Sequence, residues 1–271
     1  DDLAATAGLL LEGGVDITRL NVVRRSLSRL KGGGLRRMVG SSTATTLIVS
    51  DVIGDDPRTI ASGPTVEPDP GAHPTAAEVL RDAGVWDRVP AAVRDHLRNA
   101  PHSHEPWPYD DLVRVIATGV IAAEAAAEAL SSVAEVELHT DPIEGDAVDA
   151  ARRFTASRGP GVHVGYGETT VDVRGDGIGG RNQHAALWAA IDIGGSDGVF
   201  AALSTDGIDG ASRAAGAIVD GGTADRCRAA GIDPEAALER CDSTPALDAS
   251  GDLVVTGPTG TNVGDLWIWW P

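Results

Sequence analysis

The sequence predicts an α/β protein built from two α/β domains whose sheets are mostly parallel. From residue 111 onward, short apolar runs of strand length alternate with longer stretches of helical periodicity. Such alternation is typical of parallel strands that are covered by helices on both faces. The stretch 101–108, PHSHEPWP, has no periodicity and is read as a linker. We therefore place the first domain and its linker at residues 1–107, and the second domain at residues 108–271.

The first domain begins inside a helical pattern. Asp1 is not a methionine, and DDLAATAGLLLEGG reads as a helix already under way, so we expect this domain to be incomplete at its N-terminal end. Gly13 ends that helix, and Leu20, Val23 and Leu27 recur at helical spacing in the next one. The expected elements are helices over 4–11 and 19–30, a buried strand over 46–49, and helices over 75–83 and 91–97.

The second domain carries the alternating pattern to the end of the chain. Its last strand is rich in tryptophan and fits either the core or an interface with a second copy, so a homodimer is one option for the assembly. The expected strands are 112–117, 133–138, 162–164, 171–173, 200–204, 253–255 and 265–270, and the expected helices are 121–130, 146–156, 185–191, 223–230 and 234–240.

The chain is strongly acidic, with a formal net charge of −18. The acid excess is spread along the chain, and Lys31 is the only lysine. Such a surface suits high salt, where screening reduces self-repulsion, and we expect a halophilic protein; an ordinary acidic surface is the alternative. Nucleic acid and anionic membranes attract basic patches, so neither is expected as a partner.

The two cysteines, Cys227 and Cys241, stand alone in the sequence, without a second cysteine at metal-binding spacing. Free thiols in a reducing compartment are the expected state. No apolar run is long enough to span a bilayer. We therefore expect a cytoplasmic protein without a signal peptide or a membrane span.

One stretch of the second domain, GYGETTVDVRGDGIGGRNQH, leads from a strand through a glycine-dense loop into an apolar helix. Free backbone N–H groups at such a helix start bind anions, and Arg181 adds a planar cation suited to phosphate or carboxylate. Gly175, Gly177 and Gly180 also satisfy G-x-G-x-x-G, the fingerprint of a dinucleotide-binding turn. The acidic residue of that fingerprint comes late, at Asp206. An anion site is therefore favoured over a dinucleotide site or a glycine turn without a ligand.

Carboxylates follow two of the predicted strands. Asp51 comes after the strand over 46–49, and Asp206 and Asp209 come after the strand over 200–204. Open α/β sheets bind ligands at the carboxyl ends of their strands, where a carboxylate can hold a metal ion or accept a proton. A surface turn rich in Asp and Gly is the alternative reading.

Two further loops combine glycine with hydroxyl or amide side chains, and such loops hold anions through backbone and side-chain donors. As plain turns they need no ligand. Lys31, which precedes three glycines, either complements the dipole of the helix over 19–30 or directs its ammonium group to a ligand. The loop residues expected to bind are Ser62, Gly63, Thr65, Thr259, Thr261 and Asn262.

Five segments of the chain carry a family resemblance: NVVRRSLSRLKGG, SDVIGDDPRTIASGPTVEPDP, GETTVDVRGDGIGGRNQ, STDGIDGASRAAGAIVDG and VVTGPTGTNVGDL. In this order they resemble the two-domain glycerate 2-kinases, whose C-terminal part is called the MOFRL domain. The resemblance implies part of the family's Rossmann-like first domain over 1–107, a MOFRL-type domain over 108–271, and an active-site cleft between them. It also implies ATP-dependent phosphorylation of D-glycerate to 2-phosphoglycerate with a divalent metal ion, taken as Mg²⁺.

Two other activities stay open beside the kinase. Members of the family are often labelled hydroxypyruvate reductases, so an NAD(P)H-dependent reductase is the first alternative. A non-catalytic remnant of the kinase fold is the second, because the Gly-Lys-Ala segment of the family's N-terminal section is absent from this chain. That absence leaves open whether the chain catalyses on its own.

The chain also departs from the family's pattern at three places. His184 stands where the family usually has Glu, and Ala211-Ser212 stands where it usually has Pro-Thr. Cys241 begins a Cys-Asp-Ser segment where the family tends to have Asn-Asp-Ser. Among these changes, the Glu-to-His change is the one that removes a charge carrier.

Phosphoryl transfer depends mainly on charge neutralisation and positioning, and the candidate roles follow from that requirement. Arg181 is expected to hold the glycerate carboxylate or the transferring phosphoryl group, and Lys31 to contact phosphate. Asp51, Asp206 or Asp209 is expected to bind Mg²⁺ or to accept the proton of the substrate hydroxyl, with Asp51 and Asp206 as the expected metal ligands. The residues expected to bind ATP or glycerate are Ser62, Gly63, Thr65, Glu168, Thr169, Gly179, Gly180, Asn182, Asp209, Thr259, Thr261 and Asn262.

Overall fold

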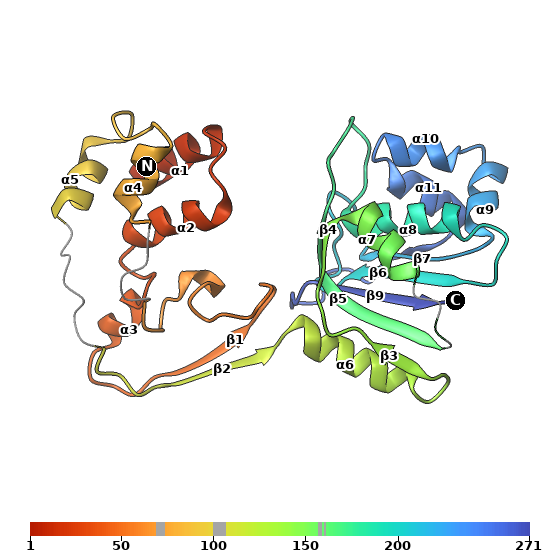
Figure 1. Ribbon diagram of the computed structural model, residues 1–271, viewed down its shortest axis with the longest axis horizontal. Helices are drawn as coiled ribbons and strands as arrows, with labels where there is room; N and C mark the ends of the chain where they lie inside the picture. The colour runs from red at the N-terminus through yellow and green to blue at the C-terminus, as the bar shows by residue number, and fades with distance from the viewer. Residues whose placement is uncertain (69–73, 100–106, 157–158, 160) are drawn as a thin grey trace. The chain divides into compact units, whose positions relative to one another are not determined.

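A computed structural model describes residues 1–68, 74–99, 107–156, 159 and 161–271. The chain divides into two compact units, which Figure 1 colours by residue number. The first unit comprises Asp1–Ile48 and Asp55–Val115, and the second comprises Val49–Gly54 and Ile116–Pro271. Most of the linker predicted at 101–108 lies outside the described residues.

The first unit is held together by apolar side chains of its helices. Leu10, Val79 and Leu80 are completely buried in one core cluster. In the described part of this unit, the sheet is the two-stranded pair of β1 and β2, so the parallel sheet of a Rossmann-like domain is not found there. Its elements are α1 (Asp2–Glu12), α2 (Ile17–Ser26), α3 (Gly34–Val39), β1 (Thr45–Val49), the 3-10 helix η1 (Ile60–Ser62), α4 (Ala76–Asp82), α5 (Ala91–Asn99) and β2 (Leu112–Ala117).

Helix α2 is shorter than predicted. Asp16 caps its start by accepting a hydrogen bond from the Arg19 N–H, and the helix ends at Ser26 rather than at Leu30. Lys31 therefore lies five residues beyond the helix, and the interpretation that it complements the α2 dipole is wrong. The chain turns instead through Gly33, whose φ of 79° favours glycine, into α3, which the sequence did not predict.

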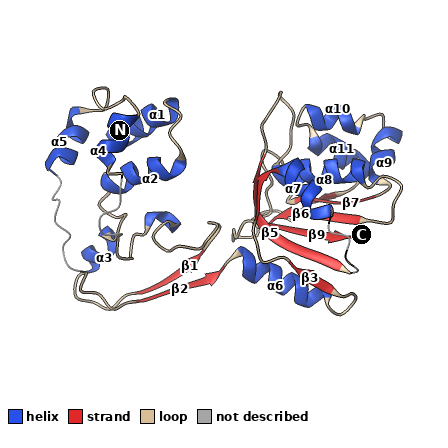
Figure 2. Ribbon diagram, in the orientation of Figure 1, coloured by secondary structure: helices blue, strands red, loops and turns tan. Residues whose placement is uncertain are grey.

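The second unit is a sheet with helices on both faces (Figure 1). Helix α6 packs on one face against β3 and β5, and α7 and α8 cover the other face (Figure 2). Its elements are α6 (Gly119–Leu130), β3 (Val136–Leu138), β4 (Ile143–Asp146), α7 (Ala147–Thr155), β5 (Val162–Thr170), α8 (Arg181–Asp192), β6 (Val199–Ser204), β7 (Gly216–Asp220), α9 (Thr223–Ala229), α10 (Pro234–Glu239), α11 (Ser243–Ser250), β8 (Leu253–Val254) and β9 (Asp265–Trp270).

The strand directions correct one part of the predicted fold class. The order of the sheet is β3-β5-β9-β6-β7-β8, and β4 pairs with β5. β3 and β4 run parallel to β5, but β5–β9, β6–β9, β6–β7 and β7–β8 are antiparallel pairs. The α/β architecture is confirmed, whereas the expectation of a mostly parallel sheet is wrong. Two features produce the antiparallel pairs. β7, which was not predicted, follows β6 through a loop without a helical crossover, and such a connection gives an antiparallel pair. β9 runs antiparallel to both of its neighbours, β5 and β6.

The late aromatic strand belongs largely to the core. Along β9, Trp267 and Trp269 are buried against the α8 side of the sheet, with exposures of 1% and 6%. Leu266 and Ile268 alternate with them and pack on the α6 side. Trp270, at the end of the strand, is exposed. The tryptophans predicted to be either core or interface are therefore mainly core.

The segment predicted as a short strand at Val171 and Val173 is loop. β5 already begins at Val162 and ends at Thr170, so the alternating valines lie just beyond the paired part of the strand. The loop then runs to Arg181, the first residue of α8. This loop places the glycine-dense stretch beside the end of β5, where it forms one wall of a pocket.

Candidate functional site

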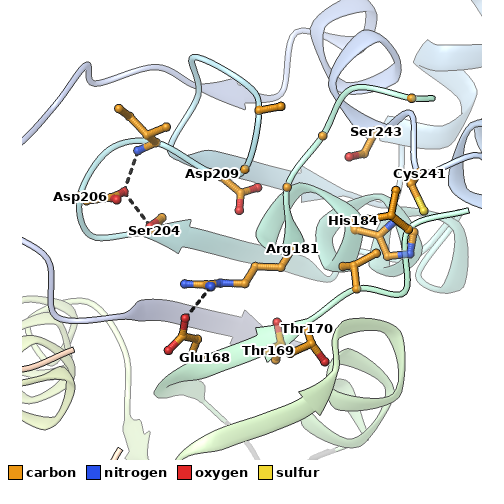
Figure 3. A pocket seen from close by; sticks show the side chains of 18 of the residues that line it. Glu168, Thr169, Thr170, Arg181, His184, Ser204, Asp206, Asp209, Cys241 and Ser243 are labelled. Carbon is orange, nitrogen blue, oxygen red and sulfur yellow. Dashed lines mark hydrogen bonds and ion pairs between the residues drawn. The ribbon is translucent and has the colours of Figure 1, made fainter. Parts of the chain in front are cut away.

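A pocket of about 690 Å³ lies in the second unit at the end of β5 (Figure 3). The last residues of β5, the glycine loop, the first turn of α8 and the loop after β6 form its walls. Segments that are distant in sequence thus meet at one place, as expected for the ligand site of an α/β sheet. The predicted site residues that line it are Glu168, Thr169, Gly179, Gly180, Arg181, Asp206, Asp209 and Asn262.

Arg181 carries positive charge in this pocket. Its Nη1 donates to Glu168 Oε1 at 2.8 Å, and its Nε and Nη2 donate to the two oxygens of Asp265 at 2.6 and 3.0 Å. Burial opposes the charge of the guanidinium, but the hydrogen bonds and charges of Asp265 and Glu168 outweigh burial and raise the pKa of Arg181. Among the described residues, three of its five N–H groups are used, so two remain for a ligand.

Two backbone N–H groups at the start of α8, those of Asn182 and Gln183, are not available to a ligand, in contrast to the predicted anion site. Asp209 accepts from the backbone N–H groups of Asn182 and Gln183 at 3.1 and 2.8 Å, and from both side-chain amides. Its side chain is buried, with 2% exposure. Asp209 therefore acts as an internal cap, and the protein's own carboxylate fills the position predicted for a substrate anion.

Asn182 is also committed to the fold rather than to a ligand. It is completely buried, and its Oδ1 accepts from the Trp267 indole at 2.8 Å while its amide donates to Asp209. Burial raises the pKa of Asp209, and the hydrogen bonds from Gln183 and Asn182 oppose that shift by favouring the carboxylate. The predicted ligand-binding roles of Asn182 and Asp209 are therefore replaced by a role in holding α8.

Asp206 faces the pocket from the loop after β6. Its Oδ1 accepts from the Ser204 hydroxyl and the Ile208 N–H, both at 2.8 Å. In the described part of the chain its Oδ2 accepts no hydrogen bond. This free oxygen can bind a cation or accept a proton.

The loop before β9 closes over the same region. The Thr259 hydroxyl donates to the Thr205 carbonyl at 2.6 Å, and its N–H donates to the Asp206 carbonyl at 3.0 Å. Asn262 lines the pocket, and its Nδ2 donates to Asp51 Oδ2 at 3.0 Å. The Asn262 contact links the pocket to Asp51, which lies 211 residues earlier in the chain. Thr261 is exposed on this loop.

The carboxylates suit Mg²⁺ in chemistry but do not form a complete cage. Mg²⁺ prefers oxygen ligands and is commonly held by one or two carboxylates together with substrate phosphates. Over the described residues, no three metal-ligating side chains that include Asp51 or Asp206 lie within 4.8 Å of one another. Asp206 and Asp51 are therefore better suited to bind Mg²⁺ together with a nucleotide phosphate than to hold a permanently bound ion.

Three buried polar atoms that line the pocket have no hydrogen-bond partner within the described chain: Thr169 Oγ1, His184 Nδ1 and Ser243 Oγ. Thr169, His184 and Ser243 are 2%, 9% and 0% exposed. An unpaired buried polar atom costs about 1–3 kcal/mol, so most such atoms in proteins are paired. Their collection around one pocket indicates that a polar ligand or ordered water completes them (Figure 3).

His184 contributes an uncharged hydrogen-bond donor or acceptor to the pocket. Burial lowers the pKa of His184, and the more modest opposing effects of Asp146 and Asp209 do not reverse the shift. The imidazole is therefore uncharged at neutral pH. It lies one turn along α8 from Arg181, so a cation and a neutral imidazole line the same pocket.

The remaining predicted residues come together in the first unit. Lys31 Nζ donates to the Ala61 carbonyl at 3.0 Å and lies 3.5 Å from the Ser62 hydroxyl. The Thr46 hydroxyl is paired with that of Thr65 at 2.9 Å. Lys31 thus lies beside the hydroxyl-rich loop.

The glycines after Lys31 serve this loop rather than an open anion site. The Gly32 N–H donates to the Ser62 carbonyl at 2.9 Å, and the Gly33 N–H donates to the Gly63 carbonyl at 2.7 Å. Ala61 and Ser62 have φ angles of 51° and 64°, which non-glycine residues rarely adopt. Such strained backbone is found most often at functional sites.

Sequence reasoning missed several residues of the pocket. Asp265 is 2% exposed and pairs with Arg181, and its position as a lone acid at the start of an apolar strand was an available signal. Ser204 and Ser243 gave no such signal, because an isolated serine at the end of a strand or the start of a helix is common. The helix that begins with Ser243 was itself not predicted.

Two family profiles match the chain. The MOFRL family profile matches residues 161–265, which contain most of the pocket. The profile described as "Domain of unknown function (DUF4147)" matches residues 1–98.

Curated relatives match almost the whole chain. The glycerate 2-kinase of Pyrococcus horikoshii is 40% identical over 99% of the chain and 64% of its own length. The D-glycerate 2-kinase of Thermotoga maritima is 37% identical over 99% of the chain and 66% of its own length. A putative hydroxypyruvate reductase of Agrobacterium vitis is 40% identical, with 98% of the chain and 72% of the relative covered. The chain belongs to the glycerate 2-kinase family with a C-terminal MOFRL domain.

Two solved structures share the fold. The crystal structure of glycerate kinase from Thermotoga maritima superposes with a TM-score of 0.87 at 34% identity, over 99% of the chain and 67% of that structure. A Pyrococcus horikoshii crystal structure superposes with a TM-score of 0.81 at 40% identity. The chain spans about two thirds of the length of these relatives.

The departures from the family's usual pattern gather in the pocket. His184, Ala211 and Cys241 line it, and Ser212 accepts a hydrogen bond from the Gln183 side chain at 2.8 Å. The three places where the sequence departs are thus neighbours of one cavity. Arg181, Glu168 and Asp265 lie together beside them as a charged cluster.

Proposed function

We propose that the full-length protein phosphorylates D-glycerate to 2-phosphoglycerate with ATP and Mg²⁺, and that the second-unit pocket binds the substrates. The observation that carries the proposal is Arg181, which has two free N–H groups beside three unpartnered buried polar atoms in one pocket. A small polyhydroxy acid offers the carboxylate and hydroxyl groups that such a lining would bind. Relatives that match the chain almost throughout are named glycerate 2-kinases, which supports this choice.

In this proposal the guanidinium of Arg181 binds the glycerate carboxylate or the transferring phosphoryl group. Glu168 and Asp265 fix its orientation, which lowers the entropic cost of forming the reactive geometry. Asp206 accepts the proton of the attacking hydroxyl or holds the metal ion, and Asp51 has the same two options. Lys31 remains the candidate phosphate ligand of the first unit. Mg²⁺, when bound with ATP, neutralises charge on the phosphates.

The metal role of Asp206 is tested by Asp206→Asn. The amide keeps an oxygen that accepts from the Ile208 N–H, but it removes the charge of the free carboxylate oxygen. We expect the Mg²⁺ concentration for half-maximal turnover of the full-length protein to rise at least about tenfold. Loss of a residue that only orients a metal ligand already weakens metal binding about tenfold or more, and loss of the ligand itself weakens it further. Asp176→Asn, an exposed change in the neighbouring glycine loop, is the matched control. An unchanged Mg²⁺ dependence together with normal turnover would remove Asp206 from the metal site.

A reductase is the second candidate, because two relatives are named putative hydroxypyruvate reductases. The glycine loop opposes it. A Cβ added at Gly177 would meet the Arg240 carbonyl and the Asp242 backbone, and one added at Gly180 would meet Asp209. Two of the fingerprint glycines thus make room for the protein's own chain, whereas in a dinucleotide fold they make room for a pyrophosphate. Binding of NAD(P)H by the full-length protein would support the reductase activity instead.

We further propose that the protein works in a reducing cytoplasm and tolerates high salt. Both cysteines of the chain are free thiols, which is the usual state in such a compartment. The net charge of −18 supports adaptation to salt, because screening relieves self-repulsion of the acidic surface. No helix in the described chain has both the length and the apolarity needed to cross a membrane. A homodimer stays an option for its assembly.

A further inference from the structure

The sheet edge formed by β3 and β5 brings together two histidines and a carboxylate that the kinase site does not use. Side chains of a strand alternate between its two faces, so Glu137 and His139 project to the same side of the sheet. The parallel register pairs Glu137 with His163 on β5, which places the third side chain on that face. The opposite face carries Val162 and Val164, which pack with α6.

The distances among the ligand atoms of Glu137, His139 and His163 are similar to the distances between ligands of a tetrahedral metal ion. His139 Nε2 lies 3.2 Å from His163 Nδ1, and Glu137 Oε2 lies 3.4 Å from the same nitrogen. All three atoms lie within 4.8 Å of one another. Two ligands that each stand about 2.0–2.2 Å from a tetrahedral zinc ion are about 3.3–3.6 Å apart, so one ion can contact all three atoms after small side-chain movements.

The surroundings hold the rings in the orientation that metal binding needs. His163 is 1% exposed, and its Nε2 lies 3.4 Å from the Gly159 carbonyl. A proton on Nε2 that is directed to this carbonyl leaves Nδ1 with a free lone pair, and metal-binding histidines are usually oriented by such a partner. The His139 ring packs against Phe154 with centroids 5.1 Å apart. The Glu137 side chain is 62% exposed, which gives an ion access from solvent.

We propose that Glu137, His139 and His163 bind one Zn²⁺ ion, with water as the fourth ligand. Two imidazoles and one carboxylate suit zinc, whereas Mg²⁺ and Ca²⁺ prefer all-oxygen sites. His163 and Glu168 are five residues apart on β5, so the site stands roughly 16 Å along the strand from the kinase pocket. The ion does not take part in the proposed phosphoryl transfer: it clamps β3, the edge strand, to β5.

Zinc binding is tested by isothermal titration of the metal-free, full-length protein with ZnCl₂, prepared without a histidine tag. We expect one ion per chain and a melting temperature that rises with zinc, because an ion that binds only the folded state stabilises it. Glu137→Gln changes an exposed side chain and is expected to weaken zinc binding at least about tenfold without loss of the metal-free fold. His139→Ala is expected to abolish the rise in melting temperature.

His96→Gln, at an exposed histidine of the first unit, is the matched control and is expected to bind zinc as the wild type does. Substitution with Co²⁺ is expected to give a tetrahedral visible spectrum without a thiolate charge-transfer band, which excludes Cys227 and Cys241 as ligands. Absence of zinc binding by the wild type would overturn the proposal. Equal zinc affinity in the wild type, Glu137→Gln and His139→Ala would also overturn it, because the ion would then sit elsewhere.

Discussion

Arg181→Ala in the full-length protein is expected to lower kcat/KM for D-glycerate by about two to three orders of magnitude or more. In the proposal, Arg181 is the charged group that binds the substrate anion or the transferring phosphoryl group. Removal of one preorganised hydrogen-bond donor to the charge that develops in the transition state has an effect of this size. The measurement is steady-state kinetics with ATP and D-glycerate, with circular dichroism to check the fold.

A loss of stability in Arg181→Ala has to be distinguished from a loss of catalysis, because Arg181 also neutralises the buried carboxylate of Asp265. Asp265 is 2% exposed, and loss of one partner of a buried pair costs about 3–5 kcal/mol. The double variant Arg181→Met with Asp265→Asn removes both charges, and we expect it to regain stability but not turnover. Arg174→Ala, at an exposed arginine of the same loop, should retain normal kinetics. Near-normal turnover in Arg181→Ala would contradict the proposed role.

Asp209→Ala is expected to lower the free energy of unfolding of the second unit by about 3 kcal/mol or more. The substitution leaves the N–H groups of Asn182 and Gln183 and the Gln183 amide without their buried acceptor. Each unsatisfied buried donor costs about 1–3 kcal/mol, and loss of the capping carboxylate adds to that. The measurement is urea-induced unfolding, together with hydrogen exchange of the first turn of α8.

Asp248→Ala is the matched control for Asp209→Ala. It removes an exposed carboxylate from α11 in the same unit, and we expect a change within about 0.5 kcal/mol. Faster hydrogen exchange confined to the start of α8 would show that the cap acts locally on that helix. Unchanged stability and unchanged exchange in Asp209→Ala would refute the structural role and return Asp209 to the list of candidate ligand-binding residues.

Local patterns were sufficient for much of the fold. The strands at Leu112–Ala117 and Asp265–Trp270 agree with the prediction at both ends, because each is a compact apolar run with clear boundaries. β7 was missed because its segment, Gly216–Asp220, is short and rich in small residues. The expectation of a mostly parallel sheet came from the alternation of strands and helices, which shows neither β7 nor the antiparallel insertion of β9 between β5 and β6.

The site was predictable where a residue's chemistry suggested its role, and not where the role depends on distant contacts. Arg181 was found because a cation follows a glycine loop, and the structure places it in the pocket. The capping role of Asp209 depends on a contact with a helix start 26–27 residues earlier, which no local pattern reports. The unpartnered atoms of His184 and Ser243 become visible only when burial and hydrogen bonding are known together.

The proposed glycerate kinase activity is tested most directly by a coupled assay of the full-length protein at high salt. ATP consumption is followed with D-glycerate, and NADH oxidation is followed in parallel with hydroxypyruvate. We predict ADP formation that depends on D-glycerate, with a product that NMR identifies as 2-phosphoglycerate. NADH oxidation with hydroxypyruvate in the absence of ATP turnover would contradict the kinase assignment and favour the reductase.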